Sequence, residues 1–177
     1  MAQSKKAPEK VPTNEKGEFV RKDSAFRNWV KADGSTPFTP ERDRYHLYVS
    51  MACPWAHRCL MARKLKGLEQ VISVDVLDWL LTDKGWKFSP EKPGCTVDTV
   101  NNCQYIREIY KIALPDYDGR ATVPLLWDKK TRTIVNNESS EILRMLEQEF
   151  NALCATKEQA SLELYPVALR AEIDEYN

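Results

Sequence analysis

The sequence has no long hydrophobic run and no excess of charge of one sign. Its apolar runs fall far short of the roughly 20 residues that a membrane-spanning helix needs. Lysine plus arginine and aspartate plus glutamate both number 26, so the chain offers no global attraction to nucleic acid or to an anionic membrane. With 177 residues, it can hold one sizeable domain and part of another.

The cysteines lack the patterns of structural cysteines. The five of them form no CxxC pair and no Cys/His cluster with zinc spacing, so neither a disulfide framework nor a metal site is indicated. The first ten residues have no apolar core for a secretory signal, and Glu9 argues against an organelle transit peptide. We therefore expect reduced thiols, no metal and a cytoplasmic location.

The composition changes along the chain and predicts three regions. Residues 1–44 are rich in Lys, Glu, Pro, Ser and Thr and predict an extended, mobile arm, with a possible docking patch at residues 26–30. Phe19, Phe26 and Trp29 suggest that the arm packs onto something. Residues 45–151 predict one domain, with an insertion at about 79–121 that is broken by Gly and Pro. Residues 152–177 predict the start of a helical region.

Hydrophobic periodicity gives the order of elements in the central domain. A strand at 45–50, a helix at 54–66 and a strand at 71–77 predict a βαβ unit with parallel strands. The insertion contains a helical pattern at 99–113. Strands at 122–128 and 131–137 predict a hairpin, and a helix follows from Glu138, with Asn136 or Asn137 as its cap. The order β-α-β, insertion, β-β-α is that of a thioredoxin-like α/β fold.

Cys53 is the candidate nucleophile. It stands between the first strand and the first helix, where free backbone N–H groups and the helix dipole favour a thiolate. The alternative is a small buried hydrophobe, but Pro54 fits the first helical turn and fixes the entry of the chain into the helix. Ala56 stands where a second thiol would be, so an external thiol must resolve any mixed disulfide. Cys59 faces away from Cys53 and is expected in the core.

Two neighbours of Cys53 offer weaker electrostatic support. His57, one turn along the helix, could act as a local base, although a surface or packing histidine is the more common case. Arg58 could add positive potential near the sulfur, although an arginine in a first helical turn is more often only solvated.

Two further motifs indicate a peptide ligand. Val123-Pro124 opens a strand, where a cis proline would leave the N–H and C=O of Val123 unpaired for an added peptide strand; an ordinary edge proline is the alternative. Glu138 and Ser139 open a helix, where Ser139 and free N–H groups could bind a carboxylate and Glu138 an ammonium group. Taken alone, Glu138 would be read as an acid that favours the helix dipole. With Cys53, these motifs predict a site for a small zwitterionic thiol peptide, and glutathione has that form.

The sequence resembles the cysteine-type glutathione transferases and, among them, the glutathionyl-hydroquinone reductases of the Xi class. The resemblance runs from about Gly17 to the end and is carried by these motifs: Arg27-Asn28-Trp29, residues 45–50, Ala52-Cys53-Pro54-Trp55-Ala56-His57-Arg58, residues 66–69, Gly85-Trp86-Lys87-Phe88, residues 123–128 and residues 136–140.

The resemblance implies a thioredoxin-like N-terminal domain followed by the truncated start of an all-α C-terminal domain. It implies that Cys53 takes glutathione from a glutathionyl-hydroquinone, that a second glutathione releases oxidised glutathione, and that Trp86, Val123, Pro124, Glu138 and Ser139 bind glutathione. Without the resemblance, Trp86 would be read as an aromatic that anchors the insertion. Full-length relatives are expected to be homodimers and to have a helical acceptor pocket that this chain lacks.

Two alternatives to the reductase stay open. One is a conjugating glutathione transferase, for which Ser50 is the only nearby hydroxyl. The other is an inactive fragment that binds glutathione.

Overall fold

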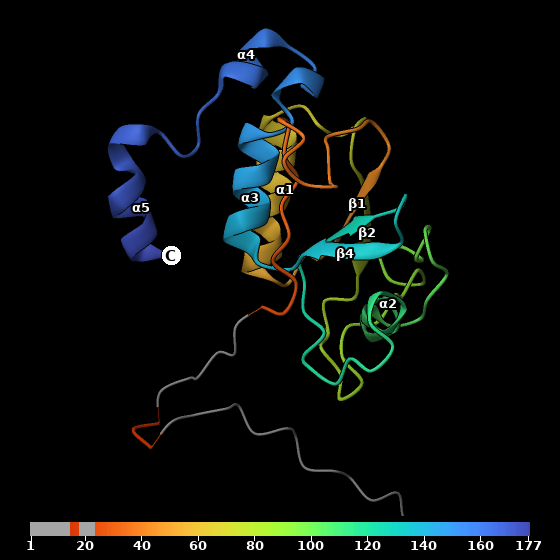
Figure 1. The fold of residues 1–177 in the computed structure, drawn as a ribbon. Coiled ribbons are helices and arrows are strands. Elements are labelled where there is room, and N and C mark those ends of the chain that lie inside the picture. The colour runs from red at the N-terminus through yellow and green to blue at the C-terminus, as the bar shows by residue number, and fades with distance from the viewer. Residues whose placement is uncertain (1–14, 18–23) are drawn as a thin grey trace, which may run out of the picture.

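The computed structural model describes residues 15–17 and 24–177. At its centre is a mixed sheet of four strands in the order β2-β1-β3-β4. Helices α1 and α3 lie side by side and cover one face of the sheet, while α2 and the irregular chain around it lie on the other side (Figure 1). The predicted thioredoxin-like arrangement is confirmed.

The strands are β1 (Tyr45–Ser50), β2 (Ser73–Leu77), β3 (Leu125–Asp128) and β4 (Thr133–Asn136). β1 pairs in parallel with β2, where His46 stands opposite Ser73, and antiparallel with β3, where His46 stands opposite Trp127. β3 and β4 form the predicted hairpin, whose turn includes Arg132 at a φ of 53°. The sheet thereby places the end of β1 and the start of β3 near the first turn of α1.

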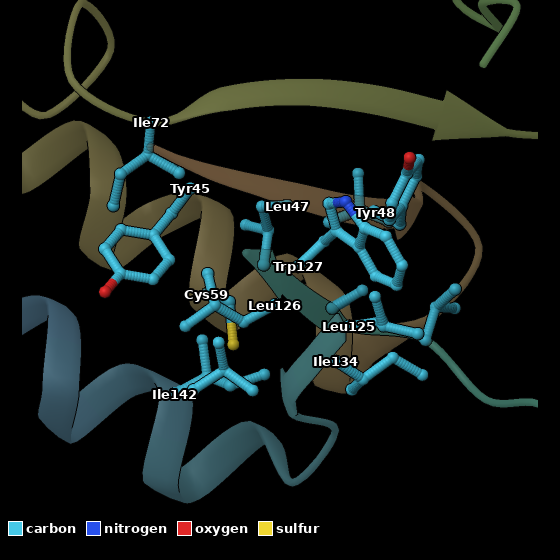
Figure 2. Close-up of a cluster of buried hydrophobic side chains, with 14 of the residues drawn as sticks. Tyr45, Leu47, Tyr48, Cys59, Ile72, Leu125, Leu126, Trp127, Ile134 and Ile142 are labelled. Atoms are coloured by element: carbon cyan, nitrogen blue, oxygen red, sulfur yellow. The ribbon is translucent and has the colours of Figure 1, made fainter. Parts of the chain in front are cut away.

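One face of the sheet buries an apolar core against α1 (Pro54–Leu65) and α3 (Ser139–Gln148). Because side chains alternate along a strand, Leu47 and Leu126 point to this face, where Cys59 and Ile142 of the two helices meet them (Figure 2). All four are 0% exposed, so Cys59 is the core residue that the sequence predicts. Full burial of such a leucine or isoleucine contributes roughly 1.5–3 kcal/mol.

The opposite face is held through buried carboxylates. Asp98, in the 79–121 segment, accepts a hydrogen bond from the Tyr48 hydroxyl at 2.8 Å. It also accepts bonds, each 3.0 Å long, from the backbone N–H groups of Val100, Asn101 and Cys103. One side chain therefore both shapes the loop and ties it to β1.

Asp75 on β2 makes the second of these attachments. Its carboxylate accepts from the backbone N–H and the hydroxyl of Thr99 at 2.7 and 2.8 Å. The Nε2 atom of His46 lies 3.1 Å from the same carboxylate. Burial raises the pKa of Asp75, but the bonds from His46 and Thr99 outweigh it and leave the pKa below its ordinary value.

Helix α2 (Ile106–Ala113) is shorter than the helix predicted at 99–113. The residues at 99–103 lie outside it because Asn102 has a left-handed φ of 58°, which interrupts a helical backbone. The N–H groups of Thr99, Val100 and Cys103 bond to the carboxylates of Asp75 and Asp98. Ile106, Ile109 and Tyr110 form the buried side of the helix.

The cap of α3 also differs from the prediction. Glu138, and neither Asn136 nor Asn137, is the N-cap, and its carboxylate accepts from the Ser140 N–H at 3.4 Å. The asparagines act one step earlier: the Asn136 side-chain oxygen accepts from the Glu138 N–H at 2.7 Å, and Asn137 donates to the Tyr110 hydroxyl at 3.0 Å. The two asparagines fix the backbone that leads into α3 and so place Glu138 at its N-cap.

Residues 24–44 pack against the domain, which corrects the expectation of a mobile arm for this part of the chain. Asn28 donates to the Val135 carbonyl at 3.0 Å, and the Phe26 ring lies 5.7 Å from those of Tyr110 and Tyr117. Trp29 packs on the same core. The predicted docking patch therefore binds this domain itself, whereas Phe19 lies outside the described residues.

After α3 the chain runs through η1 (Asn151–Leu153), α4 (Lys157–Ser161), η2 (Val167–Leu169) and α5 (Arg170–Tyr176). The buried ammonium group of Lys66, just after α1, donates to the carbonyls of Ala160 and Leu162 at 2.9 Å each. No helix within residues 15–17 and 24–177 has both the length and the apolar character to cross a membrane.

Candidate functional site

Cys53 occupies the N-cap of α1. Its backbone is extended, with φ −97° and ψ 112°, Pro54 follows in the first turn, and its carbonyl accepts from the His57 N–H at 3.0 Å. The side chain makes no cap hydrogen bond and is partly exposed. The sulfur thus stands at the positive end of a helix and can be approached from solvent.

The Val123-Pro124 peptide lies next to this sulfur. The bond is cis, and the Val123 carbonyl is 3.4 Å from the Cys53 Sγ atom, which donates to it. The prediction that this carbonyl is unpaired is therefore wrong, because the thiol itself is within reach. The Val123 N–H has no hydrogen-bond partner among the described residues. A donor beside the thiol is thus open to a ligand.

Glu138 and Ser139 stand at the start of α3, the helix beside α1. Glu138 accepts from the Ser24 hydroxyl at 3.0 Å through Oε2. Ser139 is 1% exposed, and its hydroxyl oxygen accepts from Nε and Nη2 of Arg58 at 3.1 and 2.7 Å. The two residues form a polar helix start in which an acid, a hydroxyl and a guanidinium group lie together.

Arg58 is engaged at the start of α3, and its electrostatic support of Cys53 stays a prediction. Its guanidinium group bonds to Ser139, lies 3.9 Å from Glu138 and stacks 5.0 Å from the Trp55 ring centre. The guanidinium group supports the start of α3, and its positive charge lies near the Glu138 carboxylate. His57 is exposed, and its backbone N–H donates to the Cys53 carbonyl.

The two cysteines of α1 differ sharply in their surroundings. Cys59 is buried, and burial raises the pKa of its thiol well above the ordinary value, although the Arg58 charge acts in the opposite direction. Its sulfur donates to the Ser139 carbonyl at 3.4 Å. Cys59 thus joins α1 to α3, and only Cys53 presents a thiol at the helix start.

Trp86 lies in the irregular chain before α2. It is partly buried against the core, and its carbonyl accepts from the Ile106 N–H at 3.0 Å. The structure gives it no hydrogen bond to Cys53, Val123 or Glu138. Contact of Trp86 with a ligand therefore stays a prediction.

A supporting network was missed by sequence reasoning. The Tyr110 hydroxyl donates to the Thr122 carbonyl at 3.0 Å and accepts from the Thr122 N–H at 3.2 Å and from Asn137 at 3.0 Å. It joins α2, the residue before Val123 and the residue before Glu138. No local pattern marks such a network, because its members lie far apart in the sequence.

No group of three or more His, Cys, Asp or Glu side chains that could hold a metal ion occurs among residues 15–17 and 24–177. The polar groups at the site are a thiol, a backbone N–H, an acid and a guanidinium group.

Comparison with known proteins places this arrangement in a family. The model of the glutathione S-transferase N-terminal domain matches residues 52–149, from just before Cys53 through α3. Glutathionyl-hydroquinone reductase YqjG of Escherichia coli is 52% identical over 167 residues, which are 91% of this chain and 50% of that protein.

Two solved structures agree with this finding. The Xi glutathione S-transferase of Phanerochaete chrysosporium has a TM-score of 0.84 and 53% identity over 89% of this chain and 52% of that one. The glutathione-bound structure of Escherichia coli YqjG has a TM-score of 0.79 and 52% identity, over 85% and 50% of the two chains. This chain spans about half the length of these relatives. It belongs to the glutathione S-transferase family, and its close homologues are glutathionyl-hydroquinone reductases and Xi-class glutathione transferases.

Proposed function

We propose that this chain carries the glutathione site and the reactive thiol of a cytoplasmic glutathione-dependent reductase that converts glutathionyl-hydroquinones to hydroquinones. The observation that carries the proposal is the 3.4 Å approach of the Cys53 sulfur to the Val123 carbonyl at the cis proline. This contact brings a thiol and a backbone position for a peptide ligand together. Two relatives are named glutathionyl-hydroquinone reductases, and one solved relative contains bound glutathione. These names support glutathionyl-hydroquinones as the substrate class.

The residues present fit glutathione as a ligand. Its cysteinyl backbone can add beside Val123, whose N–H is a donor that is not otherwise used within the described chain. A carboxylate of the peptide meets free N–H groups at the start of α3, with Ser139 and Arg58 beside them, and Glu138 receives the ammonium group. In this proposal Trp86 and Pro124 complete the wall around the peptide.

The chemistry needs one protein thiol and two molecules of glutathione. The Cys53 thiolate attacks the sulfur of the glutathionyl-hydroquinone and forms a disulfide to glutathione. The bond between that sulfur and the ring breaks, its electron pair goes to the ring carbon, and a proton from solvent completes the hydroquinone. The thiolate of a second glutathione then attacks the bound glutathione sulfur, releases oxidised glutathione and restores the Cys53 thiolate.

The structure weighs against conjugation of electrophiles. That reaction needs a hydroxyl that stabilises the thiolate of glutathione, and Ser50 is the nearest candidate before Cys53. Ser50 is 0% exposed, and its hydroxyl donates to the Asp78 carbonyl at 2.8 Å and accepts from the Ala52 N–H at 3.3 Å. These two bonds hold the Ser50 hydroxyl at the end of β1, so the hydroxyl is not available to a ligand.

A second candidate is a glutathione-binding unit in which Cys53 forms the adduct without turnover. In both versions we propose that residues 152–177 belong to a helical domain, the kind of domain in which an aromatic acceptor pocket would lie, and that the protein forms a homodimer. The two versions share the same thiol and differ in whether hydroquinone is released.

The test is to mix the chain with a glutathionyl-hydroquinone and excess glutathione and to measure hydroquinone release, together with the glutathione adduct by intact mass. We expect Cys53→Ser to lower release on the order of a thousandfold and to abolish the adduct, since a hydroxyl is a poor nucleophile without a base. Cys103→Ser is the matched control: burial raises the pKa of Cys103 to about 12, so this thiol is protonated at neutral pH.

Two results would decide against the reductase. Release that survives in Cys53→Ser would remove Cys53 from the chemistry. An adduct on Cys53 without release would favour the binding unit over the enzyme.

A further inference from the structure

A cavity of about 390 Å³ lies on the sheet away from the thiol. Its walls include Ser73, Thr99, Asn101, Trp127, Lys129 and Arg132. Ser73 and Trp127 both pair with His46 near the start of β1, whereas Cys53 follows the end of that strand. The cavity is therefore separate from the proposed glutathione site, and its volume is within the usual range for small ligands.

The charge of the cavity is one-sided. Lys129 and Arg132 line it, and no carboxylate does. The Lys129 ammonium group is 3.5 Å from the Ser73 hydroxyl, and within residues 15–17 and 24–177 neither cation forms an ion pair. The nearby Asp75 is occupied by Thr99 and His46, and Asp128 by Arg44. Two positive charges thus face a hollow without a counter-charge.

Arg132 holds its place in an unfavourable backbone conformation. Its φ of 53° is in the left-handed region, where the side chain crowds the following carbonyl and glycine is the favoured residue. A tight hairpin turn alone would be better served by glycine or asparagine. An arginine at this position is explained if its guanidinium group binds a ligand in the cavity.

The wall also contains hydrogen-bond donors that the protein does not use. Trp127 is 0% exposed, and its indole N–H has no partner among the described residues, although buried N–H groups are nearly always paired. The Asn101 side chain donates to Tyr48 at 3.0 Å and has a second N–H available. The cavity therefore combines two cations, spare N–H donors and the partly exposed apolar side chain of Val100.

We propose that this cavity is a binding site for a phosphate monoester with a small apolar or aromatic body. A doubly charged phosphate matches the two cations, its oxygens accept from the N–H donors, and its organic part packs on Val100. The proposal is independent of the chemistry at Cys53.

The test is an NMR titration of the chain with phenyl phosphate, with inorganic phosphate and succinate as parallel arms. We expect a saturable shift of the Trp127 indole N–H signal, identified with Trp127→Phe, and of the backbone amides of Thr99, Lys129 and Arg132. Phenyl phosphate should bind more tightly than inorganic phosphate, because the ring adds contact with Val100. Succinate should bind more weakly than phenyl phosphate.

Arg132→Gly is the decisive variant, because glycine suits the turn and the fold is kept. It should raise the Kd for phenyl phosphate about tenfold, as should Lys129→Gln, while Lys157→Gln on α4 removes the same charge elsewhere and should leave the Kd unchanged. Glutathione adduct formation on Cys53 should be the same in Arg132→Gly as in the original chain. Absence of a saturable shift, shifts confined to other residues, or equally tight binding of succinate would overturn the proposal.

Discussion

The two faces of the sheet are held by different forces. On the face covered by α1 and α3, Leu47 and Leu126 are buried against apolar side chains of the helices. On the other face, buried carboxylates of Asp75 and Asp98 bond to the backbone of the loop before α2. Apolar packing is diffuse and shared by many residues, whereas the polar attachments are few and directional. Both faces bury apolar side chains, including Tyr48 and Trp127 on the second face, but only the second face adds bonds that set the path of one loop.

This difference bears on function because the two parts of the proposed glutathione site depend on different faces. Cys53 and Ser139 are placed by the packed helices. Trp86 and Thr122 depend on the segment around α2 that the polar face holds. Changes on the two faces should separate loss of the fold from loss of the loop.

The largest effect is expected from Leu47→Ala. The side chain is 0% exposed in the middle of the helix face, so its truncation leaves a cavity and should lower the free energy of unfolding by about 2–5 kcal/mol. Urea denaturation followed by far-UV circular dichroism measures this loss. Leu80→Ala, at a side chain that is 56% exposed, is the control and should change the free energy of unfolding by less than about 0.5 kcal/mol. A loss below about 1 kcal/mol for Leu47→Ala would contradict the assignment of stability to this face.

A smaller and more local effect is expected from Asp98→Ala. It leaves the Tyr48 hydroxyl and three backbone N–H groups without their acceptor, which should cost about 1–3 kcal/mol. Amide hydrogen exchange should accelerate at Val100, Asn101 and Cys103 and stay slow in α1. The exposed Asp116 provides the matched control, Asp116→Ala. Equal acceleration in α1 would show that the polar face supports the whole fold.

The smallest effect is expected from the acid titration of Asp75. Its pKa is below the ordinary 3.8 in the folded chain, because the bonds from His46 and Thr99 outweigh burial. Its contribution to stability is therefore present above pH 3.8 and is lost as the pH falls through the lower, folded value. Asp75→Asn should make the loss of stability in acid less steep, and urea midpoints measured at a series of pH values would show it.

The decrease should be partial, because the pKa of Asp128 is also lowered: burial raises it, but bonds from Arg44 and Thr131 outweigh that effect. An acid dependence that is unchanged in Asp75→Asn would mean that Asp75 does not contribute.

The sequence predicted the elements of the helix face well, because their signals are local. Apolar spacing marks α1 and α3, an alternating pattern marks β1, and a β-branched run marks β2. The strands predicted at 71–77, 122–128 and 131–137 begin two or three residues later in the structure, and the helix predicted at 99–113 begins at Ile106. The part lost from that helix contains Asn102 at a left-handed φ of 58°, and Thr99 bonds to Asp75, which is 24 residues away in the sequence.

The candidate site shows the same division. Cys53 at the start of a helix and Val123-Pro124 before a strand are local motifs, and the structure places them 3.4 Å apart. The bonds from Arg58 to Ser139 depend on α3 lying beside α1, so they could not be predicted from the local sequence. Phe26 and Trp29 were predicted to pack, but the surface that they contact was not, because the few apolar residues of 24–44 do not form a periodic pattern.

The buried ammonium group of Lys66 has a consequence for the last part of the chain. Its two acceptors are the carbonyls of Ala160 and Leu162, and amide carbonyls do not gain protons in mild acid. The segment at residues 157–162 is therefore attached to the end of α1 by hydrogen bonds that persist in mild acid. The bonds to the buried carboxylates on the sheet weaken as those carboxylates gain protons.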